Sequence, residues 1–583
     1  MIHQSFASSL PETIPQLIQL NLVSGATALG SVTNLPSQDF ELTHCPKLDP
    51  KPDYASNIRS MMDTNQAEQG TFNKPETLRE LLESRAASAP DKHFLFSEAD
   101  GRRFTFAQFD RAVNRAAGLL KVHGVAKGDV VSLLLPNSAE YIIAYFACWK
   151  LGVVAGPVNS LLKAQEISFV ISDSETKALL VHPDFLPTIA SIKSQLPGLR
   201  EVIAFDDEAA ATKDFSDDLH ASSTSLSSPD INRDTEAIII YTSGTTGTPK
   251  GCLLTHGNLI ANARQISQWL GFSKDDRLLT IMPLFHMNAV SVTTMSALYA
   301  GGSTVVSPRF SASRFWQIIS DFQITSFGSV ATMLSMLLTT YPDGVPEGLQ
   351  TEQLRFAMCG SAPVPAEVMK RFEETFNCLV IEGYGLSEST CRSTFNPPDE
   401  RRRPGSCGKP IGNEMRVVDE DDQEVGTGEL GEIILRGENI LKGYYRNPEA
   451  TATAFRNGWF HTGDIGYRDA DGFFFIVDRK SDMIIRGGEN IYPREIDEVL
   501  YQHPAIASAA TLGVPDQLYG EEVAAFIVLK EGREATEEEI IAFCRARLAD
   551  YKCPKSVRIV NEIPKGPTGK LLKRELAKQF LES

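Results

Sequence analysis

The sequence lacks an apolar run long enough to cross a bilayer. A spanning helix needs about 20 mainly apolar residues, whereas the nearest candidate, Ala289–Gly302, is shorter and contains serine and threonine. The N-terminus has no basic stretch followed by an apolar one, and the C-terminal Phe-Leu-Glu-Ser is not a peroxisomal signal. We therefore expect neither a transmembrane segment nor secretion.

Paired cysteines are also missing. The nine cysteines are scattered, and no two of them form a Cys-x-x-Cys pair. An odd, scattered set is typical of neither a disulfide framework nor a zinc site. These cysteines indicate reduced thiols in a cytoplasmic protein.

The chain also has no excess of basic residues. The chain has 56 Lys and Arg against 74 Asp and Glu, for a net charge of −18. Nucleic acids are bound by basic faces, so this charge argues against nucleic acid as the main partner. The charge does not argue against small polyanions such as ATP or CoA, which need only a local cluster of donors. We interpret the overall negative charge as one that keeps the protein soluble.

The length of the chain predicts at least two domains, because 583 residues exceed what a single hydrophobic core usually holds. Residues 1–70 are rich in Ser, Thr, Pro, Gln and Asn, and we expect a disordered extension there. Met61 or Met62 is an alternative start, so whether residues 1–61 belong to the mature protein stays open.

Short apolar strands and amphipathic helices alternate from about residue 75 to 475. Val130–Leu135, Ala178–Val181 and Ala237–Tyr241 have the pattern of parallel strands buried on both faces, and Thr255–Leu270 that of an amphipathic helix. Asp471-Gly472 predicts a tight turn between two strands. We expect an α/β fold, with layered α/β subdomains and a small β-rich subdomain in a large domain 71–480, and a smaller α+β domain 481–583.

Tyr241–Gly251, YTSGTTGTPKG, follows a buried strand and combines glycines, hydroxyls and a lysine. Glycine lets backbone N–H groups approach an anion, and hydroxyls add donors. This composition predicts a loop that holds the phosphates of ATP. The residues predicted to contact the phosphates are Thr242, Ser243, Gly244, Thr245, Thr246, Gly247 and Lys250. A P-loop NTPase is excluded because Gly251 follows Lys250, where that signature has Ser or Thr.

YTSGTTGTPKG resembles the signature of the adenylate-forming superfamily, which includes acyl-CoA synthetases, nonribosomal peptide adenylation domains and luciferases. Further motifs follow in the order of that family to about residue 575: Pro283–His286, Cys359–Pro363, Tyr384–Glu388, Trp459–Asp464 and Pro564–Lys570. The resemblance implies a two-step reaction. A carboxylate first attacks the α-phosphate of ATP to give acyl-AMP and pyrophosphate, and a thiol, usually that of CoA, then displaces AMP.

The resemblance also implies roles for single residues. Glu388, with Thr245, would bind Mg²⁺, which prefers oxygen ligands. Asp464 would accept hydrogen bonds from the ribose hydroxyls, and Arg479 would reach the ribose or the phosphates. Lys570 would contact the reacting carboxylate and the α-phosphate, and His286 would orient or admit the acid. The remaining nucleotide-site residues are Ser361, Gly383, Tyr384, Gly385 and Ser387, with Tyr384 stacked near adenine.

Relatives in this superfamily rotate the small C-terminal domain between the two half-reactions. The hinge position corresponds to Ser481, where relatives commonly carry Asp or Lys. After rotation, the loop around Gly487 and Gly488 would line the tunnel for the pantetheine arm of CoA, because paired glycines allow close backbone approach.

An ATP-dependent acid:CoA ligase is the leading hypothesis. The alternatives are an acyl-AMP ligase that loads a carrier protein and, from a different class, a non-catalytic nucleotide-binding protein. The last would be expected to have lost Lys570, Glu388 or Asp464, and all three are present. Phe310–Trp316 and Arg402–Ser406 resemble segments of bacterial ligases for crotonobetaine/carnitine and medium-chain acids, without fixing the acid. A homodimer stays an open expectation.

Overall fold

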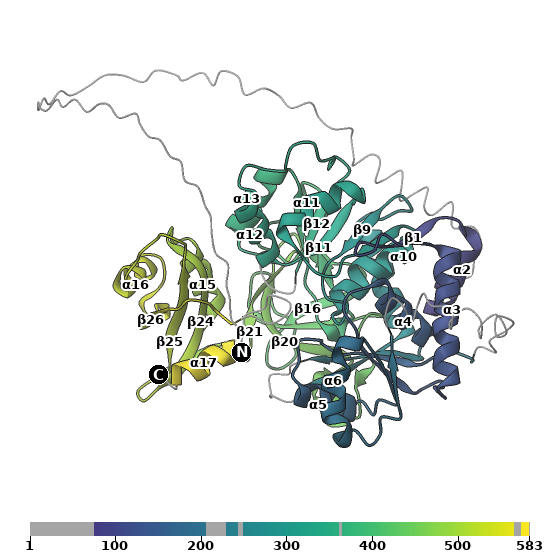
Figure 1. Ribbon diagram of the computed structural model, residues 1–583. Helices are drawn as coiled ribbons and strands as arrows, with labels where there is room; N and C mark the ends of the chain where they lie inside the picture. Colours follow the sequence, from purple (N-terminus) through teal and green to yellow (C-terminus); the bar gives the residue numbers. More distant parts are fainter. Residues whose placement is uncertain (1–74, 206–228, 243–248, 361–363, 565–572, 582–583) are drawn as a thin grey trace, which may run out of the picture. The chain divides into compact units, whose positions relative to one another are not determined.

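The computed structural model describes residues 75–205, 229–242, 249–360, 364–564 and 573–581 (Figure 1). All of them belong to one compact unit, Thr71–Ser583. The predicted extension 1–70 lies outside the described residues. So do several predicted site residues: Ser243, Gly244, Thr245, Thr246, Gly247, Ser361 and Lys570.

The first large sheet carries the end of the predicted phosphate loop. Its order is β18-β8-β7-β4-β3-β5-β6; β7, β4, β3, β5 and β6 are parallel, and β8 and β18 join antiparallel. The strands of this sheet are β3 (Val130–Leu134), β4 (Val154–Pro157), β5 (Ala178–Val181), β6 (Glu201–Ala204), β7 (Glu236–Thr242), β8 (Lys250–Thr255) and β18 (Gly443–Tyr444). The three predicted strands are therefore confirmed in type, and their parallel neighbours account for their continuous burial.

A second seven-stranded sheet has the order β13-β12-β11-β9-β10-β1-β2, parallel except for β2. Its strands are β1 (His93–Ser97), β2 (Arg103–Thr105), β9 (Arg277–Thr280), β10 (Ser303–Val306), β11 (Ser326–Ser329), β12 (Phe356–Cys359) and β13 (Leu379–Glu382). The segments that follow β12 and β13 contain two of the predicted motifs. Parallel strands bring their carboxyl ends to one edge, so Gly360 and Gly383, the first residues after these two strands, lie at the same edge.

Helices cover both sheets, and Figure 1 shows α11, α12 and α13 beside β11 and β12. The predicted amphipathic helix is α9, His256–Trp269, which begins after a capping box formed by Thr255 and Asn258. No helix among the residues described is long and apolar enough to cross a membrane. The remaining α-helices of the larger domain are α2 (Leu78–Ser88), α3 (Phe106–Val122), α4 (Ala139–Lys150), α5 (Ala164–Asp173), α6 (Leu186–Ile192), α10 (Ser296–Ala300), α11 (Ala312–Asp321), α12 (Ala331–Thr340), α13 (Ala366–Phe376) and α14 (Pro448–Ala454).

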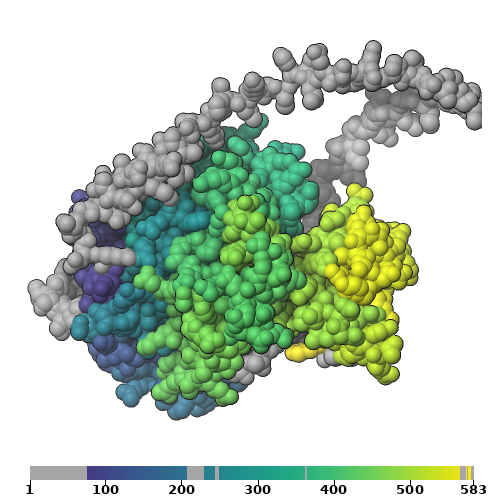
Figure 2. Space-filling model, turned by 180° about the vertical axis from the view of Figure 1, so that it is seen from behind, coloured from purple at the N-terminus to yellow at the C-terminus, as the bar shows by residue number. Residues whose placement is uncertain are grey.

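A smaller antiparallel sheet has the order β16-β17-β20-β19, with β21 paired to β20. Its strands are β16 (Glu414–Val418), β17 (Gly431–Arg436), β19 (Phe455–Arg456), β20 (Trp459–Arg468) and β21 (Phe474–Arg479). The predicted turn at Asp471-Gly472 connects β20 to β21, and Gly472 has φ +82°. Figure 2 shows this green part of the chain as a broad area of one face.

Strands β14 (Thr394–Phe395) and β15 (Lys409–Pro410) form a separate two-stranded antiparallel sheet. The C-terminal part of the chain forms a further sheet with its own hydrophobic core, which includes Ile496, Ile527 and Ile540. Its strands are β22 (Ile484–Arg486), β23 (Glu489–Ile491), β24 (Ile506–Asp516), β25 (Gly520–Leu529) and β26 (Ser556–Ile559), and its helices are α15 (Pro493–Tyr501), α16 (Glu537–Arg545) and α17 (Lys573–Leu581). The chain therefore has a large α/β N-terminal domain and a small α+β C-terminal domain, as the sequence predicts. The boundary at 480/481 stays a prediction.

Candidate nucleotide and acid site

The two ends of the predicted phosphate loop face each other across a hairpin. Thr242, the last residue of β7, pairs with Lys250, the first residue of β8. Gly251 packs so closely that a Cβ atom there would lie 2.9 Å from the side chain of Ile239. The Lys250 ammonium lies 5.4 Å from the centre of the Tyr444 ring. A positive charge therefore stands where the loop closes, although residues 243–248 themselves lie outside the described residues.

The segment Tyr384–Glu388 follows β13 and is held by close packing of its glycines. A Cβ atom on Gly385 would lie 1.9 Å from the carbonyl oxygen of Cys391, and one on Gly383 would lie 2.5 Å from the Phe395 ring. Both positions therefore require glycine for close approach. Ser387 and Glu388 begin a short 3₁₀ turn, and Glu388 Oε1 accepts a 3.1 Å hydrogen bond from the Tyr444 hydroxyl.

Asp464 and Arg479 come together because β20 and β21 pair in register at these two residues. Arg479 Nε lies 3.3 Å from Asp464 Oδ1, and the Tyr384 hydroxyl donates a 2.5 Å hydrogen bond to Asp464 Oδ2. Asp464 is only 3% exposed. Burial, followed by the nearby Asp464 carboxylate, raises the pKa of Tyr384 well above its ordinary value, so the phenol stays protonated and donates. Three predicted site residues thus form one cluster.

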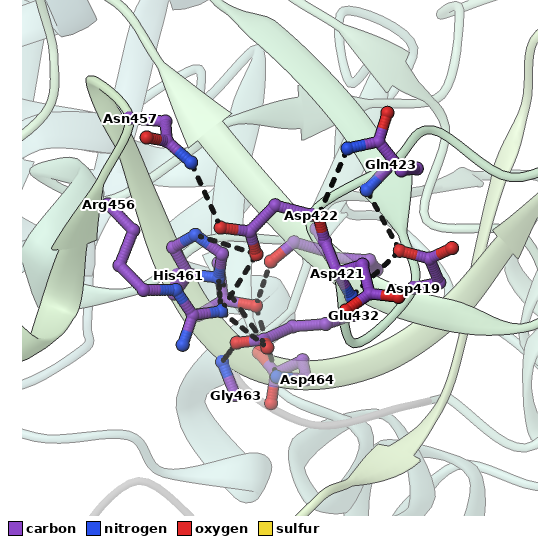
Figure 3. Close-up of polar contacts among 12 residues, drawn as sticks. Asp419, Asp421, Asp422, Gln423, Glu432, Arg456, Asn457, His461, Gly463 and Asp464 are labelled. Atoms are coloured by element: carbon purple, nitrogen blue, oxygen red, sulfur yellow. Dashed lines mark hydrogen bonds and ion pairs between the residues drawn. The ribbon is translucent and has the colours of Figure 1, made fainter.

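Behind Asp464 lies a second polar group, drawn in Figure 3. Glu432 Oε1 accepts a 3.1 Å hydrogen bond from the backbone N–H of Gly463, and its other oxygen lies 3.5 Å from His461 Nδ1 and 3.7 Å from Arg456. Arg456 also pairs with Asp422 at 3.0 Å. His461, a residue of the predicted motif Trp459–Asp464, therefore packs within a supporting polar network.

His286 lies at the turn that precedes a π-helix, Asn288–Met295. Its ring centre is 4.7 Å from that of Phe285, and its Nε2 atom is buried without a hydrogen-bond partner. Burial lowers the pKa of His286 to about 4, so the imidazole is neutral at physiological pH. A neutral imidazole can offer one N–H donor to an acid, but carries no charge that would attract it.

Gly487 and Gly488 form the turn of the β22–β23 hairpin, with φ values of +59° and +93°. Both values lie in the left-handed region, which favours glycine. A Cβ atom on Gly487 would also lie 3.0 Å from the Tyr519 ring. Ser481 lies between β21 and β22 and is exposed.

For four residues near these motifs, no local sequence pattern predicts a role in the site. Tyr444 holds Glu388, and Glu432 holds the backbone before Asp464. Arg392 and Asn288 are buried polar side chains on the segments that follow Glu388 and His286. The contacts of the first two residues and the burial of the last two arise from segments distant in sequence, which only the folded chain brings together.

Among the residues described, no group of three or more His, Cys, Asp or Glu side chains could hold a metal ion by itself. Mg²⁺ is usually bound by one or two carboxylates together with phosphate oxygens and water. A single carboxylate such as that of Glu388, which shares the contact residue Tyr444 with Lys250, is compatible with this pattern.

Comparison with known proteins shows the same arrangement of domains. A family described as AMP-binding enzyme matches residues 82–445, and its C-terminal domain matches residues 495–570. The chain is 37% identical to a sulfoacetate–CoA ligase of Cupriavidus necator, over 86% of this chain and 97% of that one. It is 36% identical to a long-chain-fatty-acid–CoA ligase, FadD13, of Mycobacterium tuberculosis, over 86% and 98% of the two chains.

A solved structure of the anthranilate CoA ligase AuaEII with anthranoyl-AMP superimposes with a TM-score of 0.78 at 31% identity. The match covers 88% of this chain and 99% of that one. The fold described above is therefore one that binds an acyl adenylate in a related protein.

Proposed function

The chain belongs to the AMP-binding enzyme family, and we propose that it is an ATP-dependent acid:CoA ligase. It activates a carboxylic acid as acyl-AMP with release of pyrophosphate and then forms the acyl-CoA thioester. The observation that carries this proposal is the cluster of Tyr384, Asp464 and Arg479, a buried and oriented carboxylate next to a cation.

In this proposal the ribose hydroxyls of ATP donate to Asp464. Tyr384 and Arg479 hold the carboxylate in one orientation, so no reorganisation is needed when the nucleotide arrives. The loop between Thr242 and Lys250 holds the β- and γ-phosphates, and Lys250 contributes charge at its end. Glu388 and Thr245 are the proposed magnesium ligands, and the ion would neutralise charge that develops on the phosphates.

The acid enters next to His286, whose neutral imidazole orients the reacting carboxylate by an N–H bond. Lys570 then stabilises the negative charge that gathers at the α-phosphorus in adenylation. In the second half-reaction the Gly487-Gly488 turn lines the thiol tunnel, and the hinge at Ser481 moves the domain 481–583. These roles rest on the matched motifs, and Ser361, Gly383, Gly385 and Ser387 complete the proposed nucleotide site.

The names of relatives leave the acid itself open. Those above refer to a short sulfonated acid, a long-chain fatty acid and an aromatic acid, which differ in size and charge. A pyrophosphate-release assay over a panel of acids, with and without CoA, tests the function. Acid-dependent release together with a CoA thioester product is the expected result; release without any thioester would favour a carrier protein as acceptor.

A further inference from the structure

Arg392 is a buried cation without a counter-ion. Its side chain belongs to a residue only 2% exposed, and its Nε and Nη2 atoms have no hydrogen-bond partner. Within the described part of the chain no carboxylate forms an ion pair with it. A guanidinium removed from water is costly unless an anion offsets the loss. Such a cation, four residues after Glu388, calls for an anion that the described part of the chain does not provide.

The backbone of Arg392 is fixed, and its guanidinium lies 5.4 Å from the centre of the Phe395 ring, while its Nε and Nη2 atoms are left without a hydrogen-bond partner. Asn262 Nδ2 donates a 2.7 Å hydrogen bond to the carbonyl oxygen of Arg392, and Asn439 Nδ2 donates to the same atom at 3.3 Å. The guanidinium lies against Gly360, where a Cβ atom would be 2.6 Å from Nη2. Glycine at that position therefore makes room for the cation directly after β12.

A second unpartnered polar group covers the same region. Asn288 is 6% exposed, and neither of its side-chain polar atoms has a hydrogen-bond partner. Its Oδ1 atom would lie 3.1 Å from a Cβ atom on Gly328. Gly328 pairs with Met358 in the parallel register of β11 and β12, and Gly360 is two residues beyond Met358. Because alternate residues of a strand share a face, Asn288 and Arg392 stand over one face of these two strands.

We propose that Arg392, assisted by Asn288, binds a second anionic group at the far end of the acid. The substrate is then a dicarboxylate or a sulfonated carboxylate. The inference rests on the proposed function, because it names the acid for that same site. A planar guanidinium matches the paired oxygens of a carboxylate or sulfonate, and the asparagine amide adds an N–H donor. An acid with a neutral tail would leave the guanidinium unpaired.

The test compares acids of matched length that differ only in the second charge: succinate and 3-sulfopropionate against butyrate, and glutarate against pentanoate. We expect kcat/KM for pyrophosphate release to favour the dianionic member by at least about 100-fold, since a site built to bond a polar group strongly rejects an analogue without it. The ratio of succinate to 3-sulfopropionate distinguishes a carboxylate from a sulfonate as the second group.

Arg392→Met should abolish this preference by lowering kcat/KM for dianionic acids about 100-fold and leaving the monoanionic acids unchanged or improved. The preference of Arg392→Lys for dianionic acids should lie between these two values, because lysine keeps the positive charge but lacks the paired N–H donors of the guanidinium. Arg436→Met is the matched control: this arginine is half-exposed and pairs with Glu414, and its loss should leave the preference intact.

Melting temperature provides a second readout. If Arg392 is unpaired until an anionic ligand binds, the melting temperature of Arg392→Met should equal or exceed that of the unsubstituted protein. A dianionic acid with ATP should raise the melting temperature of the unsubstituted protein only. A strong loss of stability in Arg392→Met, equal losses of activity on both classes of acid, or an unsubstituted preference for butyrate would each overturn the inference. Absence of acid-dependent pyrophosphate release with every acid would overturn the proposed function as well.

Discussion

The Tyr384 hydroxyl donates a 2.5 Å hydrogen bond to the buried carboxylate of Asp464, although 80 residues separate the two along the chain. The partner that completes this arrangement, Arg479, faces Asp464 across the β20–β21 pair. Charge-assisted hydrogen bonds are short and strong, and they fix orientation as well as adding energy. The proposed ribose acceptor is thus set in place before any nucleotide binds.

Tyr384→Phe should raise KM for ATP about 10- to 100-fold, because a hydrogen bond to a charged group contributes about 1.5–3 kcal/mol. Steady-state kinetics at saturating acid measure this change. Tyr467→Phe, on the same strand as Asp464, is the control, since the Tyr467 ring stacks on Phe475. Equal effects of the two substitutions would contradict the positioning role of Tyr384.

Glu432→Gln should raise KM for ATP severalfold and leave kcat nearly unchanged. Glu432 accepts the Gly463 N–H and balances Arg456, so loss of its charge loosens the backbone that carries Asp464 (Figure 3). Glu414→Gln, which removes an exposed carboxylate paired with Arg436 on the neighbouring strand, is the matched control. A change in kcat alone would show that Glu432 does not act through Asp464.

Glu382 gives a prediction about pH and stability. Burial raises its pKa from 4.5 to about 7, against the opposing effects of the Gly405 N–H bond and the Arg494 charge. The folded state therefore holds the proton more tightly than the unfolded state, and stability falls as pH rises from about 4.5 to about 7.

Glu382→Gln removes this ionisation. Its free energy of unfolding relative to the unsubstituted protein should be higher at pH 8 than at pH 4, by up to about 3 kcal/mol. Denaturant titrations at the two pH values measure the difference. A difference that does not depend on pH would contradict the assignment.

The two half-reactions should separate in a pair of variants. Lys570→Ala should reduce acyl-AMP formation about 10²–10³-fold, the usual loss for one electrostatic donor, and spare thioester formation from supplied acyl-AMP. Gly488→Leu should do the reverse, since a side chain at φ +93° is strained and would enter the proposed tunnel. Gly532→Leu, at φ +70° in the same domain with open space around it, controls for strain alone. Loss of both steps in each variant would refute the model of two conformations.

Local patterns in the sequence predict much of the fold. Continuous apolar runs mark β3, β5 and β7, and Thr255 with the following helix marks α9, because these signals depend on near neighbours. The motifs also predict site roles for Glu388, Asp464 and Arg479, and these roles stay predictions. The pairing of Asp464 with Arg479 could be anticipated from the Asp471-Gly472 turn, but the contact with Tyr384 could not.

The supporting residues escape such prediction for a physical reason. Tyr444 and Glu432 act through partners that are distant in sequence, and Arg392 is buried by the folding of distant segments around it. Nothing in the immediate neighbours of these three residues distinguishes them from surface residues. Arg392 stands out only when burial and hydrogen bonding are both known. The substrate preference that we propose therefore depends on the tertiary structure.

An acid:CoA ligase that acts through acyl-AMP must carry out its chemistry at the α-phosphate of ATP. Exchange of labelled pyrophosphate into ATP, measured without CoA, tests this requirement most directly. We predict exchange that requires a carboxylic acid and Mg²⁺ and is lost in Lys570→Ala. Acid-dependent formation of ADP and orthophosphate without such exchange would contradict the proposed function, because it would place the reaction at the γ-phosphate.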